Sequence, residues 1–207
     1  MISVICVYND DKTLNDYLLK SIKEQNIYCE LILINNTENI YPSAAAALNV
    51  GGKKAKGDYL IFAHQDIKLD STNWLYSVER IIPDISNLGI AGVAGKRDGR
   101  GVITNVKHGS PPTFAGKYQV KVPTEVQTLD ECLIIIPKEI YNKTQFDENT
   151  CDDWHLYAVD YCLSVQENGY RAFVLPFPCH HRSSGSLSAG YFSTLEKLRL
   201  KHRLKFK

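Results

Sequence analysis

A chain of 207 residues, of which 44% are hydrophobic and 23% charged, is long enough for one well-buried core and short for two. Its 24 Lys and Arg nearly balance 23 Asp and Glu, so the formal charge is only +1 and no strong overall field attracts nucleic acid. No apolar stretch approaches the about 20 residues of a membrane span, and Met1 leads directly into a strand-like segment instead of a signal peptide. We expect a cytoplasmic protein without a nucleic-acid partner.

The first half alternates short apolar runs with helical patterns, which indicates βαβ units and a parallel sheet. Apolar runs predict strands, and residues spaced by three or four predict helices between them. The predicted strands are 2–8, 30–34, 58–63 and 89–95, and the predicted helices are 10–25, 44–48 and 73–82. We expect the second helix to end near Gly51-Gly52 and the third at Pro83.

The second half begins with a segment rich in Gly, Pro and polar residues, 96–123, which predicts a loop region with a hairpin around Gly99-Arg100-Gly101. Beyond it the pattern predicts strands over 131–136 and 171–175 and helices over 137–142 and 152–168. The tail 195–207 is basic and amphipathic. It either packs its leucines on the rest of the chain or lies on an anionic membrane surface.

Six cysteines are scattered without CxxC pairs, and four of them lie in apolar runs. This usage favours reduced, buried thiols over disulfides or a zinc cluster, which agrees with a cytoplasmic location. The six are Cys6, Cys29, Cys132, Cys151, Cys162 and Cys179.

The third predicted strand delivers His64 and Asp66 at its carboxyl end. Ligands of open α/β sheets bind at that end, and residues two apart on an extended chain project to one side. An imidazole beside a carboxylate suits a divalent metal that carries a phosphate.

Five segments in this order resemble the family 2 type of glycosyltransferases with the GT-A fold. Within it they resemble a small glycosyltransferase-like branch that has His-Gln-Asp where most members have DxD. The segments are the first strand ending in Tyr8-Asn9, 30–36, 49–66, the helix 154–169, and His181 after the last strand.

The resemblance implies one GT-A-like, Rossmann-like α/β domain over 1–207, with a central, mostly parallel sheet flanked by helices. Residues 1–95 would form the nucleotide-sugar-binding half, 96–190 the acceptor-side half and 191–207 a basic C-terminal helix.

In that family the loops after the first two strands hold the base and ribose of a nucleotide-sugar. Asn35 and Asn36 stand where acidic residues are usual, and their amides can still contact a uracil-like edge. The alternative is that they form only a turn, since Asn tolerates left-handed backbone. The donor-binding residues that the resemblance implies are Val7, Tyr8, Asn9, Asn35, Asn36, Asn49, His64, Gln65 and Arg182.

The same resemblance implies a metal site at which Asp66, His181 and His64 bind Mn²⁺ or Mg²⁺ beside the diphosphate. Imidazole favours Mn²⁺. The alternative for His64 is a hydrogen bond to ribose or a strand-capping role. His180 competes with His181, and adjacent side chains on a strand point to opposite sides, so we expect one of the two to face the site. Arg182 would close over the diphosphate.

Inverting transfer needs a general base for the acceptor hydroxyl. If Asp160 aligns with the last acid of the family's Glu-Asp-x-Asp pattern, Tyr157 and Ala158 replace the usual pair. Asp153, His155 and Asp160 are the catalytic candidates, with a helix N-cap as the alternative for the first.

Asp130-Glu131 precedes the strand 131–136 and either lines the acceptor side or lies in a solvated turn. A lone acidic pair of this kind is more often a solvated turn.

The sequence therefore predicts a hexosyltransferase-like glycosyltransferase that moves a sugar from a nucleoside diphosphate sugar, a UDP-sugar first, to a hydroxyl of a glycan or lipid-linked acceptor. Inversion, metal dependence and a place in polysaccharide biosynthesis follow from the resemblance. A peripheral contact with the inner membrane surface is one of the two alternatives for the basic tail. One alternative is an inactive domain that binds nucleotide-sugars or glycans. The other is a sugar nucleotidyltransferase, against which no glycine-rich phosphate loop follows the first strand.

Overall fold

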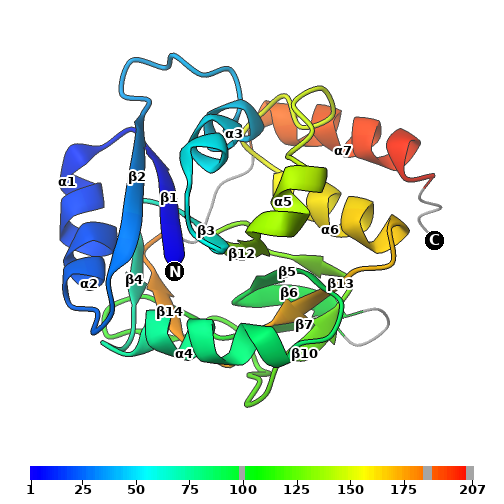
Figure 1. Ribbon diagram of the computed structural model, residues 1–207. Coiled ribbons are helices and arrows are strands. Elements are labelled where there is room, and N and C mark those ends of the chain that lie inside the picture. The colour runs from blue at the N-terminus through cyan, green and yellow to red at the C-terminus, as the bar shows by residue number, and fades with distance from the viewer. Residues whose placement is uncertain (98–100, 184–187, 204–207) are drawn as a thin grey trace.

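The computed structural model describes residues 1–97, 101–183 and 188–203. A seven-stranded sheet forms its centre, in the order β10-β13-β5-β12-β3-β1-β2 (Figure 1). The strands are β1 (Ile2–Tyr8), β2 (Cys29–Asn35), β3 (Tyr59–Ala63), β5 (Leu88–Gly92), β10 (Thr124–Val126), β12 (Leu133–Pro137) and β13 (Arg171–Val174).

Helices cover both faces of this sheet. One face packs against α1 (Asp11–Leu14), the π-helical turn Asn15–Leu19, α2 (Lys20–Lys23) and α4 (Trp74–Ile81), which the short 3-10 turn Ile82–Asp84 follows. The other face packs against α3 (Ala44–Lys54), α5 (Lys138–Lys143) and α6 (Tyr157–Glu167). The last helix, α7 (Ala189–Lys201), lies beside α6 (Figure 1). The α/β prediction is confirmed.

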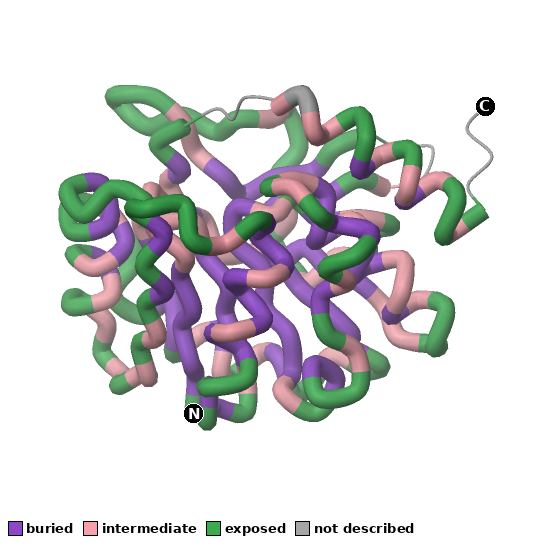
Figure 2. The backbone as a smooth tube through the Cα atoms, turned by 90° about the horizontal axis from the view of Figure 1, so that it is seen from above, coloured by how far each residue is buried: buried purple, intermediate pink, exposed green. Residues whose placement is uncertain are grey.

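The apolar runs of the sequence supply the core between these layers. Figure 2 shows buried backbone through the middle of the molecule, with exposed segments around it. β5 and β12 are buried along their whole length, which explains their unbroken apolar sequences. The starts of α1 and α3 are capped locally, since Asp10 Oδ1 accepts from Thr13 N at 2.6 Å and Ser43 Oγ accepts from Ala46 N at 3.2 Å.

The sheet is more mixed than expected. β1 pairs in parallel with β2 and β3, and β13 with β5, but β12 runs antiparallel to both β3 and β5, and β10 antiparallel to β13. Because β12 is reversed, its beginning lies beside the carboxyl end of β3, with Leu133 opposite Ala63. The chain just before β12 is therefore brought to the ligand-binding edge.

Two small sheets include strands from the segment 96–123, in which the sequence predicts mainly loop. One contains β6 (Ala94–Arg97), β7 (Gly101–Thr104) and β11 (Thr128–Leu129). β6 and β7 pair as an antiparallel hairpin, as predicted, and its expected tip at 98–100 lies outside the described residues. The other contains β4 (Ile67–Leu69), β14 (Cys179–His181), β8 (Val106–His108) and β9 (Thr113–Phe114).

Two predicted helix limits are wrong. α3 does not end near Gly51-Gly52 but continues to Lys54. The two glycines permit close packing instead of ending the helix, since a Cβ on Gly51 would collide with Ile5 and one on Gly52 with Tyr141. α6 begins at Tyr157 instead of residue 152, because Leu156 adopts a left-handed backbone with φ of 68°. Asp152 and Asp153 therefore do not cap it.

Candidate functional site

Three potential metal ligands meet at the carboxyl end of β3. The ligand atoms of His64, Asp66 and His181 lie within 4.8 Å of one another. His64 and Asp66 flank the turn between β3 and β4, and β14 pairs antiparallel with β4 so that His181 is opposite Ile67. This strand pairing joins residues more than a hundred positions apart. Two imidazoles and one carboxylate form a donor set that suits Mn²⁺ better than Mg²⁺.

Asp66 is held as a carboxylate. Its Oδ1 lies 3.2 Å from His181 Nε2, and its Oδ2 accepts a hydrogen bond from Ser183 N at 3.1 Å. Burial alone would raise the pKa of Asp66, but the contacts with His181 and Ser183 outweigh burial and hold the pKa well below its usual value. The group is therefore charged at neutral pH and can bind a cation.

His64 is held as a neutral imidazole. Burial, and then the neighbouring His181, lower the pKa of His64 to about 4. Its Nε2 lies 3.2 Å from the hydroxyl of Tyr157, and that hydroxyl donates to the backbone oxygen of Glu131 at 3.1 Å. Since the hydroxyl has one proton and gives it to Glu131, Nε2 of His64 is the donor to Tyr157, which leaves the Nδ1 lone pair for a metal.

The structure chooses between the two adjacent histidines of β14. His181 is buried and contacts Asp66, whereas the ring of His180 lies 6.2 Å from that of Tyr17 in the π-helical turn. The backbone oxygen of His181 accepts from His108 Nδ1 at 2.7 Å, so a further imidazole borders the cluster.

Gln65, between the two potential ligands, ties the turn to the loop after β1. Its Oε1 accepts from Asn9 N at 3.0 Å and Asp10 N at 3.1 Å, while its Nε2 donates to Asn9 Oδ1 at 2.7 Å. Asn9 and Gln65 are thus brought together beside the metal-ligand cluster. Their contact with a donor stays a prediction.

The predicted nucleoside-binding loops lie at adjacent strand ends, since β1 and β2 pair with Tyr8 opposite Asn35. Asn35 Oδ1 accepts hydrogen bonds from Thr37 N and Thr37 Oγ1, both at 2.8 Å. These bonds close the turn that the sequence offered as the alternative to base binding. Asn36 is buried and joins the loops, because its backbone N donates to Tyr8 O at 2.8 Å. Val7 and Tyr8 are partly buried at the same edge. Binding of a base by these residues stays a prediction.

Asn49 and Arg182 make other contacts. Asn49 is buried on α3, where its amide donates to Phe146 O and Glu148 Oε1 and accepts from the Tyr141 hydroxyl. It therefore anchors the chain between α5 and α6. Arg182 is exposed, and its guanidinium donates to Thr13 Oγ1 at 3.1 Å. That contact places Arg182 on α1, from where a diphosphate contact stays a prediction.

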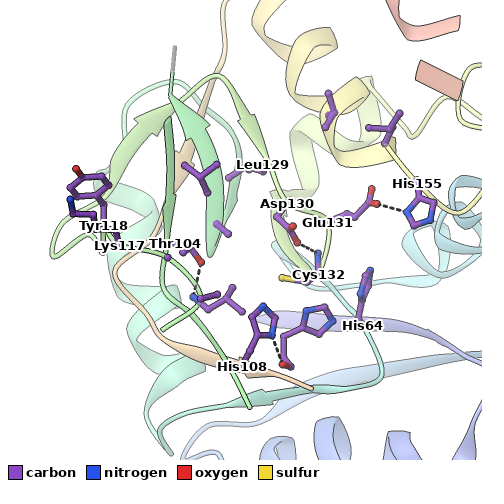
Figure 3. Close-up of a pocket in the computed structure, with 18 of the residues that line it drawn as sticks. His64, Thr104, His108, Lys117, Tyr118, Leu129, Asp130, Glu131, Cys132 and His155 are labelled. Atoms are coloured by element: carbon purple, nitrogen blue, oxygen red, sulfur yellow. Dashed lines mark hydrogen bonds and ion pairs between the residues drawn. The ribbon is translucent and has the colours of Figure 1, made fainter. Parts of the chain in front are cut away.

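A cavity of about 810 Å³ opens beside the metal-ligand cluster (Figure 3). His64 and His181 line it from the cluster, and His155 and Tyr191 from the region of α6 and α7. Segments of the small sheets and of the turn before β12 complete the wall through Thr104, His108, Lys117, Tyr118, Asp130 and Glu131. The cavity thus joins the potential donor site to the predicted acceptor-side half.

Glu131 belongs to the acidic pair for which the sequence left open the acceptor side or a solvated turn, and its side chain lines this cavity. Its Oε1 lies 3.2 Å from His155 Nδ1, and its side chain is 19% exposed. Burial raises the pKa of Glu131 above its usual value despite the contact with His155. A sequence signal existed in the acidic pair before an apolar strand, but only the reversed direction of β12 places that pair at the site.

Among the three predicted catalytic residues, only His155 lines the cavity. Asp153 accepts from the Ser188 hydroxyl at the start of α7. Asp160 is buried, and its two oxygens contact Lys201 Nζ and His202 Nε2, both at 2.8 Å. Both acids thus anchor α7. Ala158, which the sequence predicts in place of a family acid if Asp160 aligns with the last acid of the pattern, is fully buried in the core against the α3 face of the sheet.

The basic tail is partly engaged by acids of the domain. Lys197 contacts Asp152, and Lys201 contacts Asp147 and Asp160. Leu198 is buried. These contacts agree with the alternative in which the tail packs on the rest of the chain. Residues 204–207 of the predicted amphipathic segment lie outside the described residues. Of the helices described, none is long and apolar enough to cross a membrane.

The mixed α/β sheet flanked by helices matches the fold of GT-A glycosyltransferase structures. The chain belongs to the glycosyltransferase-like family, whose model matches residues 3–191. A curated relative, "ATP synthase subunits region ORF 6" of Fuscovulum blasticum, is 24% identical over 156 residues. That match covers 72% of this chain and 61% of the relative.

Solved structures share the fold. The chain is similar to Staphylococcus aureus TarS 1-349 in complex with UDP-GlcNAc, with a TM-score of 0.66 and 16% identity over 97% of this chain and 66% of that one. It is also similar to the mannosyltransferase PcManGT of Pyrobaculum calidifontis in complex with GDP-Man and Mn²⁺, with a TM-score of 0.65 and 14% identity over 100% of this chain and 65% of that one. For GalNAc-T7 with UDP, GalNAc and Mn²⁺ the TM-score is 0.65, the identity 14% and the coverage 95% and 47%. The chain thus spans less than two thirds of the length of these proteins.

Proposed function

We propose that this chain is a metal-dependent glycosyltransferase that transfers a sugar from a nucleoside diphosphate sugar to a hydroxyl acceptor. The observation that carries the proposal is the cluster of His64, Asp66 and His181 beside a cavity at the carboxyl edge of the sheet. Family membership supports it, as do neighbours of the same fold whose structures contain UDP-GlcNAc, or GDP-Man with Mn²⁺. UDP-sugar is the first donor to test, because uridine nucleotides recur among these neighbours.

The residues present fit the divalent metal that this proposal implies. Asp66 supplies negative charge, while His64 and His181 supply imidazole nitrogens. When bound, such a metal neutralises the charge that develops on a diphosphate leaving group. Ser183 and Tyr157 orient the ligands, and Gln65 holds the loop after β1 against the same turn. We expect Mn²⁺ to be preferred over Mg²⁺.

We also propose that different parts of the chain bind the donor and the acceptor. Residues 1–95 carry the donor-side loops and two of the three potential ligands, and 96–190 line most of the cavity. An inverting reaction at a glycan or lipid-linked hydroxyl is the expectation for this cavity. The segment 191–207 contributes Tyr191 to the cavity wall, so α7 belongs to the acceptor side.

One observation favours a second candidate, a domain that binds nucleotide-sugars without transferring them. The family's usual base position is Ala158, whose methyl group lies in the core. A binder would take up the donor in the presence of metal and release no nucleoside diphosphate. Binding and release must therefore be measured separately.

The test is thermal stabilisation by UDP, GDP and their sugars, with and without Mn²⁺, on the wild type and on Asp66→Ala. A metal-dependent shift that is lost in this variant is expected. Asp84→Ala is the matched control, because Asp84 is exposed and precedes β5, at the opposite edge of the sheet. Release of nucleoside diphosphate in the same samples separates a transferase from a binder. Absence of any nucleotide-dependent shift in the wild type would overturn the proposal.

A further inference from the structure

A glycosyltransferase of this kind needs a group that takes the proton of the acceptor hydroxyl. The carboxylates expected at the start of α6 do not serve, since Asp153 contacts Ser188 and Asp160 contacts Lys201 and His202. Ala158 has no proton acceptor. The cavity wall instead contains two carboxylates, Asp130 and Glu131, which enter it from the turn before β12.

Glu131 occupies a fixed place close to the metal-ligand cluster. Its backbone oxygen accepts from the Tyr157 hydroxyl, and the same hydroxyl contacts His64. One tyrosine oxygen thus connects Glu131 with a potential metal ligand. The backbone oxygen of the next residue, Cys132, accepts a hydrogen bond from His64 N at 2.9 Å. In Figure 3 the side chain of Glu131 extends toward His155, on the side of the cavity away from His108.

The two carboxylate oxygens of Glu131 differ in their surroundings. Oε1 contacts His155 Nδ1 at 3.2 Å, which fixes the orientation of the carboxylate. Oε2 is buried, and within the described part of the chain it has no hydrogen-bond partner. A buried carboxylate oxygen without a donor is costly, so a hydroxyl that entered the cavity and donated to the carboxylate of Glu131 would be favoured.

Asp130 is a different kind of group. Its side chain is exposed, and its Oδ1 accepts from Cys132 N at 2.9 Å, which closes the turn. Water solvates such a carboxylate. Glu131 is instead desolvated, which raises its pKa, and a general base is most effective when its pKa approaches the working pH.

We propose that Glu131 is the catalytic base for the acceptor hydroxyl, in a role that the residue at position 158 cannot fill. The inference rests on the proposed function. The hydroxyl oxygen forms a bond to the anomeric carbon of the donor, and its proton passes to the carboxylate of Glu131. The bond from the anomeric carbon to the diphosphate oxygen breaks, and the electron pair leaves with the nucleoside diphosphate. With water as acceptor, the same step gives free sugar and nucleoside diphosphate.

The experiment measures slow donor hydrolysis, because it needs no knowledge of the natural acceptor. UDP-GlcNAc, UDP-glucose, UDP-galactose and GDP-mannose are incubated with Mn²⁺ and the wild type, Glu131→Gln or Asp130→Asn, and the release of UDP or GDP is followed. Each variant removes one charge, and each new amide keeps an oxygen that can accept from the neighbouring donor. The thermal shift caused by UDP and Mn²⁺ is measured on the same samples.

We expect Glu131→Gln to lower hydrolysis at least about 100-fold, within the usual range for loss of a general base, with the UDP-dependent shift retained. Asp130→Asn should lower it less than about fivefold. The hydrolysis rate of the wild type should fall as the pH is lowered, with a midpoint above pH 4.5, the usual pKa of a Glu. Glu131→Gln should lack this decrease.

Three outcomes would overturn the proposal. Hydrolysis by Glu131→Gln within threefold of the wild type would remove Glu131 from the chemistry and leave the proposed function intact. A large loss in Asp130→Asn alone would assign the base to Asp130. Failure of the wild type to bind UDP or release it would overturn the base and the proposed function together.

Discussion

The hydroxyl of Tyr157 lies 3.2 Å from Nε2 of His64, at the first residue of α6. Because the hydroxyl proton goes to the backbone oxygen of Glu131, this contact sets the tautomer of His64 and leaves the Nδ1 lone pair free of the proton. If Asp160 aligns with the last acid of the family's pattern, Tyr157 stands in place of the first acid, and its hydroxyl orients a potential metal ligand.

Removing this hydroxyl tests its orienting role. Tyr157→Phe should weaken Mn²⁺ binding by about 10- to 100-fold, the usual cost of losing a hydrogen bond to a metal-bound histidine. The measurement is the Mn²⁺ concentration that gives half of the UDP-dependent thermal shift. Tyr161→Phe is the matched control, because the Tyr161 hydroxyl is buried on the same helix and has no partner among the described residues. Equal effects of both exchanges would contradict the orienting role.

The donor set predicts a metal preference that a single exchange should change. His64→Asp replaces an imidazole with a carboxylate and restores an Asp-x-Asp spacing with Asp66. We expect the preference for Mn²⁺ over Mg²⁺ in UDP binding to fall by about tenfold, since carboxylates suit Mg²⁺ and imidazoles suit transition metals. Parallel titrations with the two ions provide the comparison. An unchanged ratio of the two half-saturating concentrations would show that His64 is not a ligand.

The sequence revealed the metal-ligand cluster better than the wall of the adjoining cavity. Strands β1, β2 and β3 follow from local apolar runs, and His64 and Asp66 follow β3 directly. The choice of His181 over His180 depends on the pairing of β14 with β4, and the place of Glu131 depends on the reversed direction of β12. Pairings between distant strands leave little trace in local periodicity, so these two residues needed the structure.

The close packing of α3 on the sheet predicts a stability effect far from the chemistry. Gly51→Ala normally favours a helix, but here the added Cβ would collide with Ile5 on β1. We expect a net loss of about 1–3 kcal/mol in the free energy of unfolding, the usual cost of overpacking a core. Urea denaturation measures it. Lys53→Ala is the control, because Lys53 is exposed on the same helix, and stabilisation by Gly51→Ala would refute the packing argument.

The attachment of α7 should make stability depend on pH through Asp147. Burial alone would raise the pKa of this carboxyl, but hydrogen bonds from Lys201 and Thr150 outweigh burial and lower the pKa below its usual value of 3.8. A carboxyl whose pKa is lower in the folded state stabilises the fold above its unfolded pKa, and this contribution is lost as the pH falls toward the folded pKa. Asp147→Asn should therefore lower the melting temperature at pH 7, and the difference from the wild type should shrink below about pH 4.

Asp152→Asn is the matched control for this prediction, because Asp152 also contacts a lysine of α7, Lys197, but its side chain is 50% exposed. Solvent screens such a surface pair, so we expect a smaller change in melting temperature than for Asp147→Asn. Thermal melts of both variants and the wild type between pH 3 and pH 8 provide the comparison. A difference for Asp147→Asn that stays constant across that range would show that its effect comes from lost packing, since a lost ion pair with Lys201 must follow the protonation of the carboxyl.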